Sequence, residues 1–65
     1  MKINLIKDKK KTTISFDGET VSDLLKFENT NPETVLIKIN KKFATEDEIL
    51  NDGDVVELID FISKG

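Results

Sequence analysis

The chain has 65 residues, with ten lysines, thirteen acidic residues and a formal net charge of −3, and it lacks cysteine, histidine, arginine, tryptophan and tyrosine. This length predicts a single small domain over residues 1–65, with a thin hydrophobic core. The missing residue types exclude a disulfide framework, a Cys/His zinc site, a thiolate nucleophile and an imidazole base. We therefore expect a protein that is not an enzyme.

The apolar residues occur in short runs, of which Val35–Ile37 is the longest. A membrane-spanning helix needs about 20 apolar residues, and polar residues interrupt the N-terminal segment where a secretion signal would be continuously apolar. These features predict a cytoplasmic protein without a membrane partner. Residues 34–65 hold four lysines and seven acids, so they carry the whole net charge, which argues against nucleic acid as a partner.

The first half of the chain predicts a β-hairpin followed by a helix. Ile3 and Leu5 alternate with polar residues, and Ile14 and Phe16 repeat the pattern after the polar stretch 7–11, which is typical of two half-buried strands. In the helix, Thr20 is the predicted N-cap. The predicted buried face of that helix consists of Val21, Leu24 and Leu25, and the Asn29–Pro32 segment ends it.

The second half contains the strongest strand signal, at residues 35–40, which predicts a central strand with both faces partly covered. Asn40–Lys42 then predicts a turn, and Phe43 is expected to begin an irregular stretch. Glu46–Glu48 predicts one helical turn, with Ile49 and Leu50 pointing inward. Asn51–Asp54 is a further turn signal, and a last strand is predicted from Val55 to about Phe61.

Together these elements predict an α+β fold in which one main helix crosses a mixed sheet of four to five strands. The helix connects the second strand to the third, and such a crossover indicates that at least one pair of strands is parallel.

Clusters of charge suggest ligand sites, but simpler interpretations explain them better. Lys9–Lys11 would attract phosphate, yet the acidic net charge and the absence of arginine and stacking aromatic residues other than phenylalanine favour a solubilising role. The acids of Glu46–Glu48 and Asp52–Asp54 lack the regular spacing of a calcium loop. We therefore expect a solvated face and a turn there, and no metal bound by the chain.

The chain end is the remaining candidate for a reactive group. A terminal glycine leaves the carboxylate of Gly65 without a neighbouring bulky side chain, so an extended tail of residues 62–65 would enter a narrow active site on another protein. The plain alternative is a frayed end.

Four blocks of sequence resemble a known family. They are residues 18–21 with Leu24 and Leu25, residues 35–40, residues 50–58 around Asp52–Asp54, and the terminal glycine. These blocks resemble the ubiquitin-like β-grasp sulfur carriers ThiS and MoaD, and ThiS more closely because the chain is short. The resemblance implies a β-grasp fold and a monomer that acts as a protein substrate.

The resemblance also implies a function for the chain end. A partner enzyme that uses ATP and magnesium would adenylate Gly65, and a sulfur donor would convert the adenylate to a thiocarboxylate. The acceptor would be an enzyme such as thiazole synthase in thiamine biosynthesis, and the carrier itself would bind no cofactor. A molybdopterin-synthase small subunit, a tRNA-thiolation carrier or a ubiquitin-like modifier are alternatives within the same class, and a non-catalytic β-grasp interaction module is the alternative of another class.

One position departs from the family pattern, because the family ends in Gly-Gly and this sequence ends in Lys64-Gly65. Lysine adds a long stem and a charge to the tail. Three explanations stay open: the partner accepts lysine, a final glycine follows Gly65 in the complete chain, or the fold is kept without sulfur transfer. We favour retained chemistry at Gly65, with Ser63 and Lys64 as the tail that leads to it.

A docking surface is predicted beside the tail. If Val56 and Leu58 face the core, alternation turns Ile59 and Phe61 to the other face, where Leu36 joins them. Exposed apolar residues mark interaction surfaces, so the predicted partner interface consists of Leu36, Ile59, Phe61 and Ile62. Packing of Ile59 or Phe61 against a neighbouring loop is the alternative.

Overall fold

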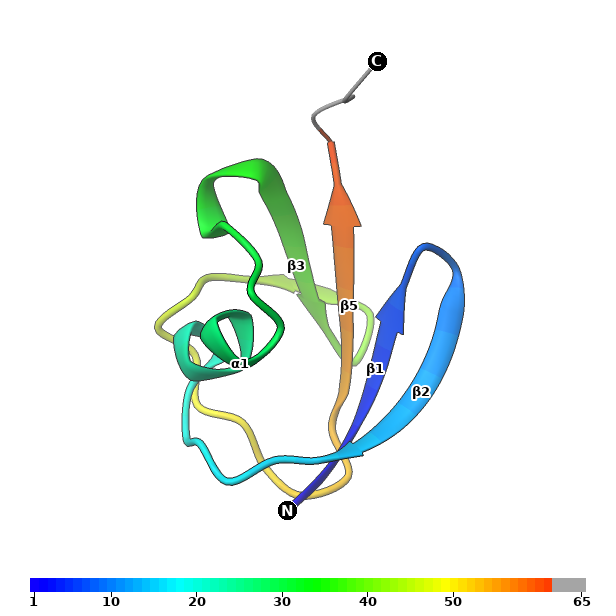
Figure 1. The fold of residues 1–65 in the computed structure, drawn as a ribbon, viewed down its shortest axis with the longest axis vertical. Coiled ribbons are helices and arrows are strands. Elements are labelled where there is room, and N and C mark those ends of the chain that lie inside the picture. The colour runs from blue at the N-terminus through cyan, green and yellow to red at the C-terminus, as the bar shows by residue number, and fades with distance from the viewer. Residues whose placement is uncertain (62–65) are drawn as a thin grey trace.

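The computed structural model of the chain describes residues 1–61, which form a five-stranded mixed sheet with one α-helix and one short 3-10 helix. The elements in chain order are β1 (Lys2–Lys7), β2 (Lys10–Ser15), α1 (Val21–Phe27), η1 (Pro32–Thr34), β3 (Val35–Ile39), β4 (Lys42–Ala44) and β5 (Val55–Asp60). The strands lie in the order β2-β1-β5-β3-β4 (Figure 1). This architecture is the predicted α+β fold, a ubiquitin-like β-grasp.

The first two strands form the predicted hairpin, with a shorter turn than the sequence suggested. β1 and β2 pair antiparallel up to Lys7 and Lys10, so only Asp8 and Lys9 lie between them. Both turn residues have positive φ, 53° and 64°, which is the turn geometry that matches the twist of a two-residue hairpin. The polar stretch 7–11 therefore belongs largely to the strands and is not a loop.

The central strand of the sheet is β5, which lies between β1 and β3 (Figure 1). It runs parallel to β1 and antiparallel to β3. A parallel pair was predicted, and the structure forms it from the first and last strands. Residues 35–40 were predicted to form a central strand with both faces partly covered. β3 is an interior strand, between β5 and β4, but β5 and not β3 occupies the middle of the sheet, and Leu36 on the outer face of β3 is 43% exposed.

Helix α1 begins at the predicted N-cap. The backbone N–H of Asp23 donates to Oγ1 of Thr20 at 3.3 Å, and the Asp23 carboxylate accepts the backbone N–H of Thr20 at 3.3 Å. This reciprocal pair is a capping box. The helix ends at Phe27, and Asn29, with φ 54°, turns the chain away. Among residues 1–61 no helix has the length and apolar character to cross a membrane.

The hydrophobic core lies between α1 and one face of the sheet. The helix contributes the predicted Val21, Leu24 and Leu25, and the strands contribute Ile3, Leu5, Val35, Ile37, Val56 and Leu58. Burial of each such side chain stabilises the fold by about 1.5–3 kcal/mol. No polar side chain among residues 1–61 is buried, so apolar packing holds the helix on the sheet.

Phe43 does not begin an irregular stretch, which corrects the sequence prediction. It lies in β4, and this strand pairs antiparallel with β3 at the edge of the sheet. A strand of three residues is too short for an alternating pattern to appear in the sequence, because the pattern needs several repeats.

Residues Glu46–Glu48 do not form the predicted helical turn. The backbone carbonyls of Glu46 and Glu48 each accept a hydrogen bond of 2.9 Å from the first N–H groups of α1, which have no partner inside the helix. The segment forms a single hydrogen-bonded turn, in which the backbone N–H of Glu48 donates to the carbonyl oxygen of Thr45 at 3.2 Å, and it does not continue as a helix. Leu50 points inward as predicted and is 3% exposed, whereas Ile49 is 68% exposed, against the prediction.

The predicted turn at residues 51–54 positions the start of β5. Gly53 has φ 88°, a conformation that glycine adopts without strain. The carboxylate of Asp54 accepts the backbone N–H of the first turn residue at 2.8 Å and the side-chain amide of Asn40 at 3.2 Å. Asp52 accepts the first backbone N–H of β1 at 2.6 Å. These bonds tie the turn to both neighbouring strands.

Candidate functional site

The site predicted from the sequence has two parts, the chain end and a docking surface beside it. The predicted tail residues Ile62, Ser63, Lys64 and Gly65 lie outside the described residues, and their roles stay predictions. The described residues define the strand that leads to the tail and the surface around that strand.

β5 leads toward the chain end from the middle of the sheet. It pairs with β1 up to Leu58 and with β3 up to Asp60. Beyond the strand, the backbone N–H of Phe61 donates to the carbonyl oxygen of Thr34 at 3.3 Å. The last described residue is therefore held by a neighbouring segment.

Two of the predicted interface residues, Leu36 and Ile59, lie on the face where alternation placed them. Val56 and Leu58 are buried in the core, so Ile59 faces the side of the sheet opposite the helix. Leu36 is the direct partner of Ile59 across β3 and β5. Phe61 is 55% exposed and follows them along the chain. An apolar pair thus lies next to the end of β5, and its role in binding a partner stays a prediction.

Two further apolar residues, Ile6 and Phe43, share this face and were not assigned to the interface from the sequence. The strand registers align Ile6 with Glu57, Glu57 with Lys38, and Lys38 with Phe43. Phe43 is 70% exposed, and Nζ of Lys38 lies 4.9 Å from the centre of its ring, which is a cation–π contact. We call the surface formed by Ile6, Leu36, Phe43 and Ile59 the open sheet face.

The sequence pattern indicates the outward orientation of one of these two residues, Ile6. Ile6 follows Leu5 directly in a strand, and neighbouring strand residues point to opposite faces, so a buried Leu5 turns Ile6 outward. For Phe43 there was no comparable signal, since its position depends on pairing with β3.

The acidic clusters take part in turns. Asp52 and Asp54 accept backbone and amide hydrogen bonds, as described above, and Glu46–Glu48 is exposed. Within residues 1–61 no group of three or more ligating side chains is close enough to hold a metal ion. The local turn thus accounts for the carboxylates of Asp52 and Asp54.

The Asp23 carboxyl has a shifted pKa. The backbone N–H of Glu19, which donates to it at 3.1 Å, and that of Thr20, at 3.3 Å, hold the pKa of Asp23 below its ordinary value of 3.8. Both donors favour the charged form. The shift thus reflects the capping of α1.

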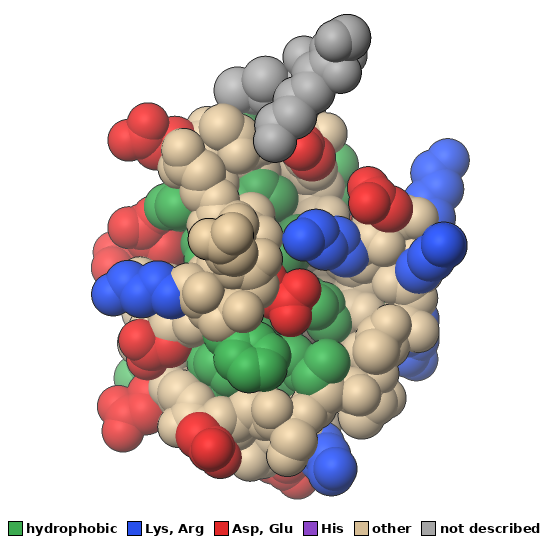
Figure 2. Space-filling view, viewed as in Figure 1, with side chains coloured by type: hydrophobic (Ala, Val, Ile, Leu, Met, Phe, Trp, Pro, Cys, Tyr) green, Lys and Arg blue, Asp and Glu red, His purple; other side chains and the backbone are tan. Residues whose placement is uncertain are grey.

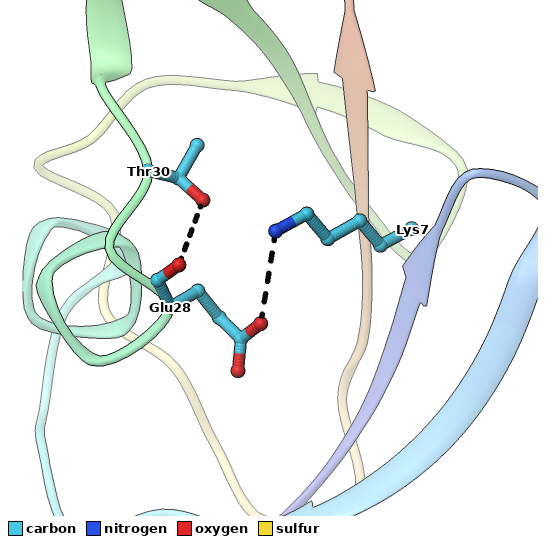
Figure 3. Close-up of polar contacts among 3 residues, drawn as sticks. All are labelled: Lys7, Glu28 and Thr30. Atoms are coloured by element: carbon cyan, nitrogen blue, oxygen red, sulfur yellow. Dashed lines mark hydrogen bonds and ion pairs between the residues drawn. The ribbon is translucent and has the colours of Figure 1, made fainter.

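A cleft of about 460 Å³ lies beside the end of β5, between β1 and the loop that follows α1. In Figure 3, Lys7 of β1 and Glu28 at the end of the helix point toward one another, with Nζ and Oε1 4.0 Å apart, and Thr30 Oγ1 donates to the Glu28 carbonyl at 3.3 Å. The cleft is lined by Lys7 but also by Asp8 and Asp60. A nucleotide phosphate would meet two carboxylates there, which does not favour ATP on this chain.

In the comparison with known protein families, the model of the ThiS family matches residues 3–65. The match covers nearly the whole chain and agrees with the β-grasp topology of the described residues. Proteins of this family are small sulfur carriers that are not catalysts themselves and that interact with activating and sulfur-acceptor enzymes. The chain therefore belongs to the ThiS family of ubiquitin-like sulfur carriers.

Proposed function

We propose that the carboxylate of Gly65 is the group on which partner enzymes act, and that the chain carries sulfur for thiazole formation in thiamine biosynthesis. The observation that carries this proposal is the family match, which extends over residues 3–65 and so includes Gly65. The chemistry is compatible with a chain that has no cysteine or histidine, because the reacting group is the chain end and not a side chain.

The proposed reaction has two steps. An oxygen of the Gly65 carboxylate attacks the α-phosphorus of ATP, pyrophosphate leaves, and an acyl-adenylate forms. The sulfur of a hydrosulfide ion then attacks the carbonyl carbon and AMP leaves, which yields the thiocarboxylate directly. If the donor is instead a persulfide, AMP leaves to give an acyl disulfide, and a thiol reduces it by forming a disulfide with the donor's inner sulfur, which releases the thiocarboxylate. The adenylating partner positions ATP and supplies the magnesium that stabilises charge on the phosphates.

The open sheet face is the proposed docking surface for that partner. Leu36 and Ile59 adjoin the end of β5, and Phe43 adds a large exposed ring. Exposed apolar clusters of this kind mark interaction surfaces, and their central residues carry most of the binding energy. Docking here would bring the chain end to the activating site, because β5 both lines the face and leads to the tail.

The first experiment tests Gly65 directly. The chain is incubated with ATP, magnesium, its cognate adenylating enzyme and a sulfur donor, and its intact mass is measured. We expect an increase equal to the replacement of one oxygen by sulfur, localised by fragmentation to Gly65. Deletion of Gly65 should abolish the increase and leave thermal unfolding unchanged, since a terminal residue contributes little to a core. The enzyme is first shown to adenylate another carrier. If this chain then shows no mass increase, the result would favour a non-catalytic interaction module.

Lys64 provides a second test, because the family has glycine at this position. We expect Lys64→Gly to raise the rate of adenylation several-fold, since it removes a long charged side chain from the tail that enters the partner. Lys64→Gln is the matched control, which removes the charge but keeps a long side chain. A slower Lys64→Gly variant would mean that the partner recognises the lysine.

A further inference from the structure

An aromatic ring is exposed at the end of α1. Phe27, the last residue of the helix, is 57% exposed, and its ring meets that of the buried Phe16 edge-on, with centroids 5.8 Å apart. This contact holds the Phe27 side chain in place and leaves more than half of it open to solvent. An open hollow of about 590 Å³ lies beside the two rings. Figure 2 shows hydrophobic side chains at the surface beside the helix. We call this feature the Phe27 hollow.

Carboxylates line the Phe27 hollow. Its lining includes three acids, Asp17, Glu19 and Asp23, and one cation, Lys26. The Asp23 carboxylate already accepts two backbone N–H groups at the start of α1. Within residues 1–61 the exposed side chains of Asp17 and Glu19 make no hydrogen bond or ion pair. Two free carboxylates therefore lie beside an exposed aromatic ring.

The charges around the hollow keep it acidic. On one side, the N-terminal ammonium donates to the carbonyl oxygen of Phe16 at 2.9 Å, and Lys2 pairs with Ser15. On the other side lies the exposed segment Glu46–Glu48, whose first and last carbonyls accept the first N–H groups of α1. The lining and these two flanks together hold six acids and three cations. A cationic ligand would be attracted to the hollow.

Backbone contacts hold the loop that carries the two free carboxylates. The N–H of Glu19 donates to the Asp23 carboxylate at 3.1 Å, and the carbonyl of Glu19 accepts the N–H of Leu50 at 2.8 Å. The preceding Gly18 lies against the ring of Phe16, where a Cβ atom would collide with that ring and with Cβ of Asp23. The loop is thus fixed from both sides, and a site that is already in place loses less entropy when it binds a ligand.

We propose that the Phe27 hollow binds an arginine side chain on a segment of a partner protein. A guanidinium group is planar, so it stacks on the exposed ring of Phe27, and its N–H groups donate to the carboxylates of Asp17 and Glu19. A lysine ammonium is compact and more strongly hydrated, so it fits the combination of ring and carboxylates less well.

The form of the hollow and the composition of the chain indicate where the arginine comes from. Pockets for free small molecules enclose most of the ligand, whereas this hollow is open, which suits a side chain that a protein surface carries. The chain itself contains no arginine, so a second copy does not supply the ligand. The partner is therefore a different protein.

The Phe27 hollow lies away from the end of β5. Ser15, next to Phe16, pairs with Lys2 at the start of β1, and the parallel strand β5 begins opposite Asn4. Figure 1 shows the loop between β2 and α1 at the end of the molecule opposite the end of β5. A partner that binds here leaves the open sheet face and the end of β5 accessible, so the proposal does not depend on the proposed function.

The test uses the isotope-labelled full chain and capped peptides, with binding followed by the NMR chemical shifts of backbone amides. One peptide carries two arginines separated by an apolar residue, and matched peptides carry lysine or the neutral isostere citrulline instead. We expect the arginine peptide to shift the amides of residues 16–19 and 23–27, and to bind more weakly as salt rises. It should bind at least about threefold more tightly than the lysine peptide and about tenfold more tightly than the citrulline peptide.

Three results of the peptide experiment overturn the proposal. They are the absence of shifts at millimolar concentration of the arginine peptide, shifts confined to the open sheet face, and equal binding of the citrulline peptide. Equal binding of the lysine peptide would overturn the assignment of the ligand to arginine.

A pair of double variants tests the carboxylates. Asp17→Asn with Glu19→Gln removes both free carboxylates of the hollow. Asp8→Asn with Glu33→Gln is the matched control, which removes the same charge at positions outside the hollow. We expect the first double variant to bind the arginine peptide at least about tenfold more weakly than the second. Equal binding by the two folded double variants overturns the role of the carboxylates.

The aromatic ring is tested separately. Phe27→Leu keeps an apolar side chain but removes the ring, and Phe43→Leu makes the same change on the open sheet face. We expect Phe27→Leu to bind the arginine peptide about threefold more weakly than Phe43→Leu, and equal binding overturns stacking on Phe27. Unfolding curves show that each variant is folded at the assay temperature. Self-association seen by sedimentation and lost in the Asp17→Asn/Glu19→Gln variant, with no binding of the arginine peptide, would assign the hollow to a second copy and overturn the proposal.

Discussion

The two faces of the sheet differ in cover, as two neighbouring residues of β3 show. On one face Ile37 lies in the core with 6% exposure, and on the other its chain neighbour Leu36 is 43% exposed. Both are large aliphatic residues of β3, and both pair with β5. Helix α1 covers only one face, so burial there stabilises the fold, while the open sheet face is available for a partner. Substitutions on the two faces should therefore separate stability from function.

The largest effect is expected on the covered face. Ile37→Ala should lower the free energy of unfolding by about 2–5 kcal/mol, since it removes buried methyl groups and leaves a cavity. The stability of a small domain is itself only about 5–15 kcal/mol. Urea unfolding followed by circular dichroism measures the change. A loss below about 1 kcal/mol would mean that this face is less tightly packed than the structure describes.

The neighbouring residue should show the opposite behaviour. Leu36→Ala is expected to change the free energy of unfolding by no more than about 0.5 kcal/mol, since the side chain is exposed. It should raise the carrier concentration needed for half-maximal adenylation by about tenfold, which corresponds to about 1.4 kcal/mol of binding. ATP–pyrophosphate exchange by the partner measures this concentration. Unchanged kinetics would remove Leu36 from the docking surface.

The parts of the fold that follow from local signals were predictable. The capping box at Thr20 and the spacing of Val21, Leu24 and Leu25 set the helix, and the alternation around Ile3 and Leu5 set the first strand. Each of these signals lies within a few residues of the element that it specifies. The same holds for the alternation along β5, which predicted the positions of Ile59 and Leu58 on opposite faces.

The parts that depend on distant contacts were not predictable. Whether Glu46 and Glu48 form a helical turn or cap α1 depends on where the first N–H groups of the helix lie. The place of Phe43 on the open sheet face depends on the pairing of β4 with β3. Nor does any local pattern indicate that the parallel strand pair consists of β1 and β5. Long-range pairing decides these features, and local patterns do not encode it.

Asp23 is part of the capping box of α1, the helix that covers one face of the sheet. A substitution of Asp23 should have the smallest of the predicted effects on stability. The pKa of Asp23 is lowered in the folded state, first by the N–H of Glu19 and then by that of Thr20. The folded state therefore binds fewer protons than the unfolded state near this pKa, and stability falls as the pH falls. The stabilisation by the charged Asp23 carboxylate is complete above 3.8, its pKa in the unfolded state, and is lost as the pH drops through its lower pKa in the folded state.

Asp23→Asn should therefore be less stable than the wild type at neutral pH, and the two should converge in acid. Thermal unfolding from pH 7 to about pH 2 measures the difference. Asparagine keeps the size and one acceptor of the side chain but cannot carry the charge that the two N–H groups favour, so the variant isolates the charge. Glu33→Gln is the control, since Glu33 lies outside α1 in η1. A difference between Asp23→Asn and wild type that stays constant with pH would show that the cap depends on geometry and not on charge.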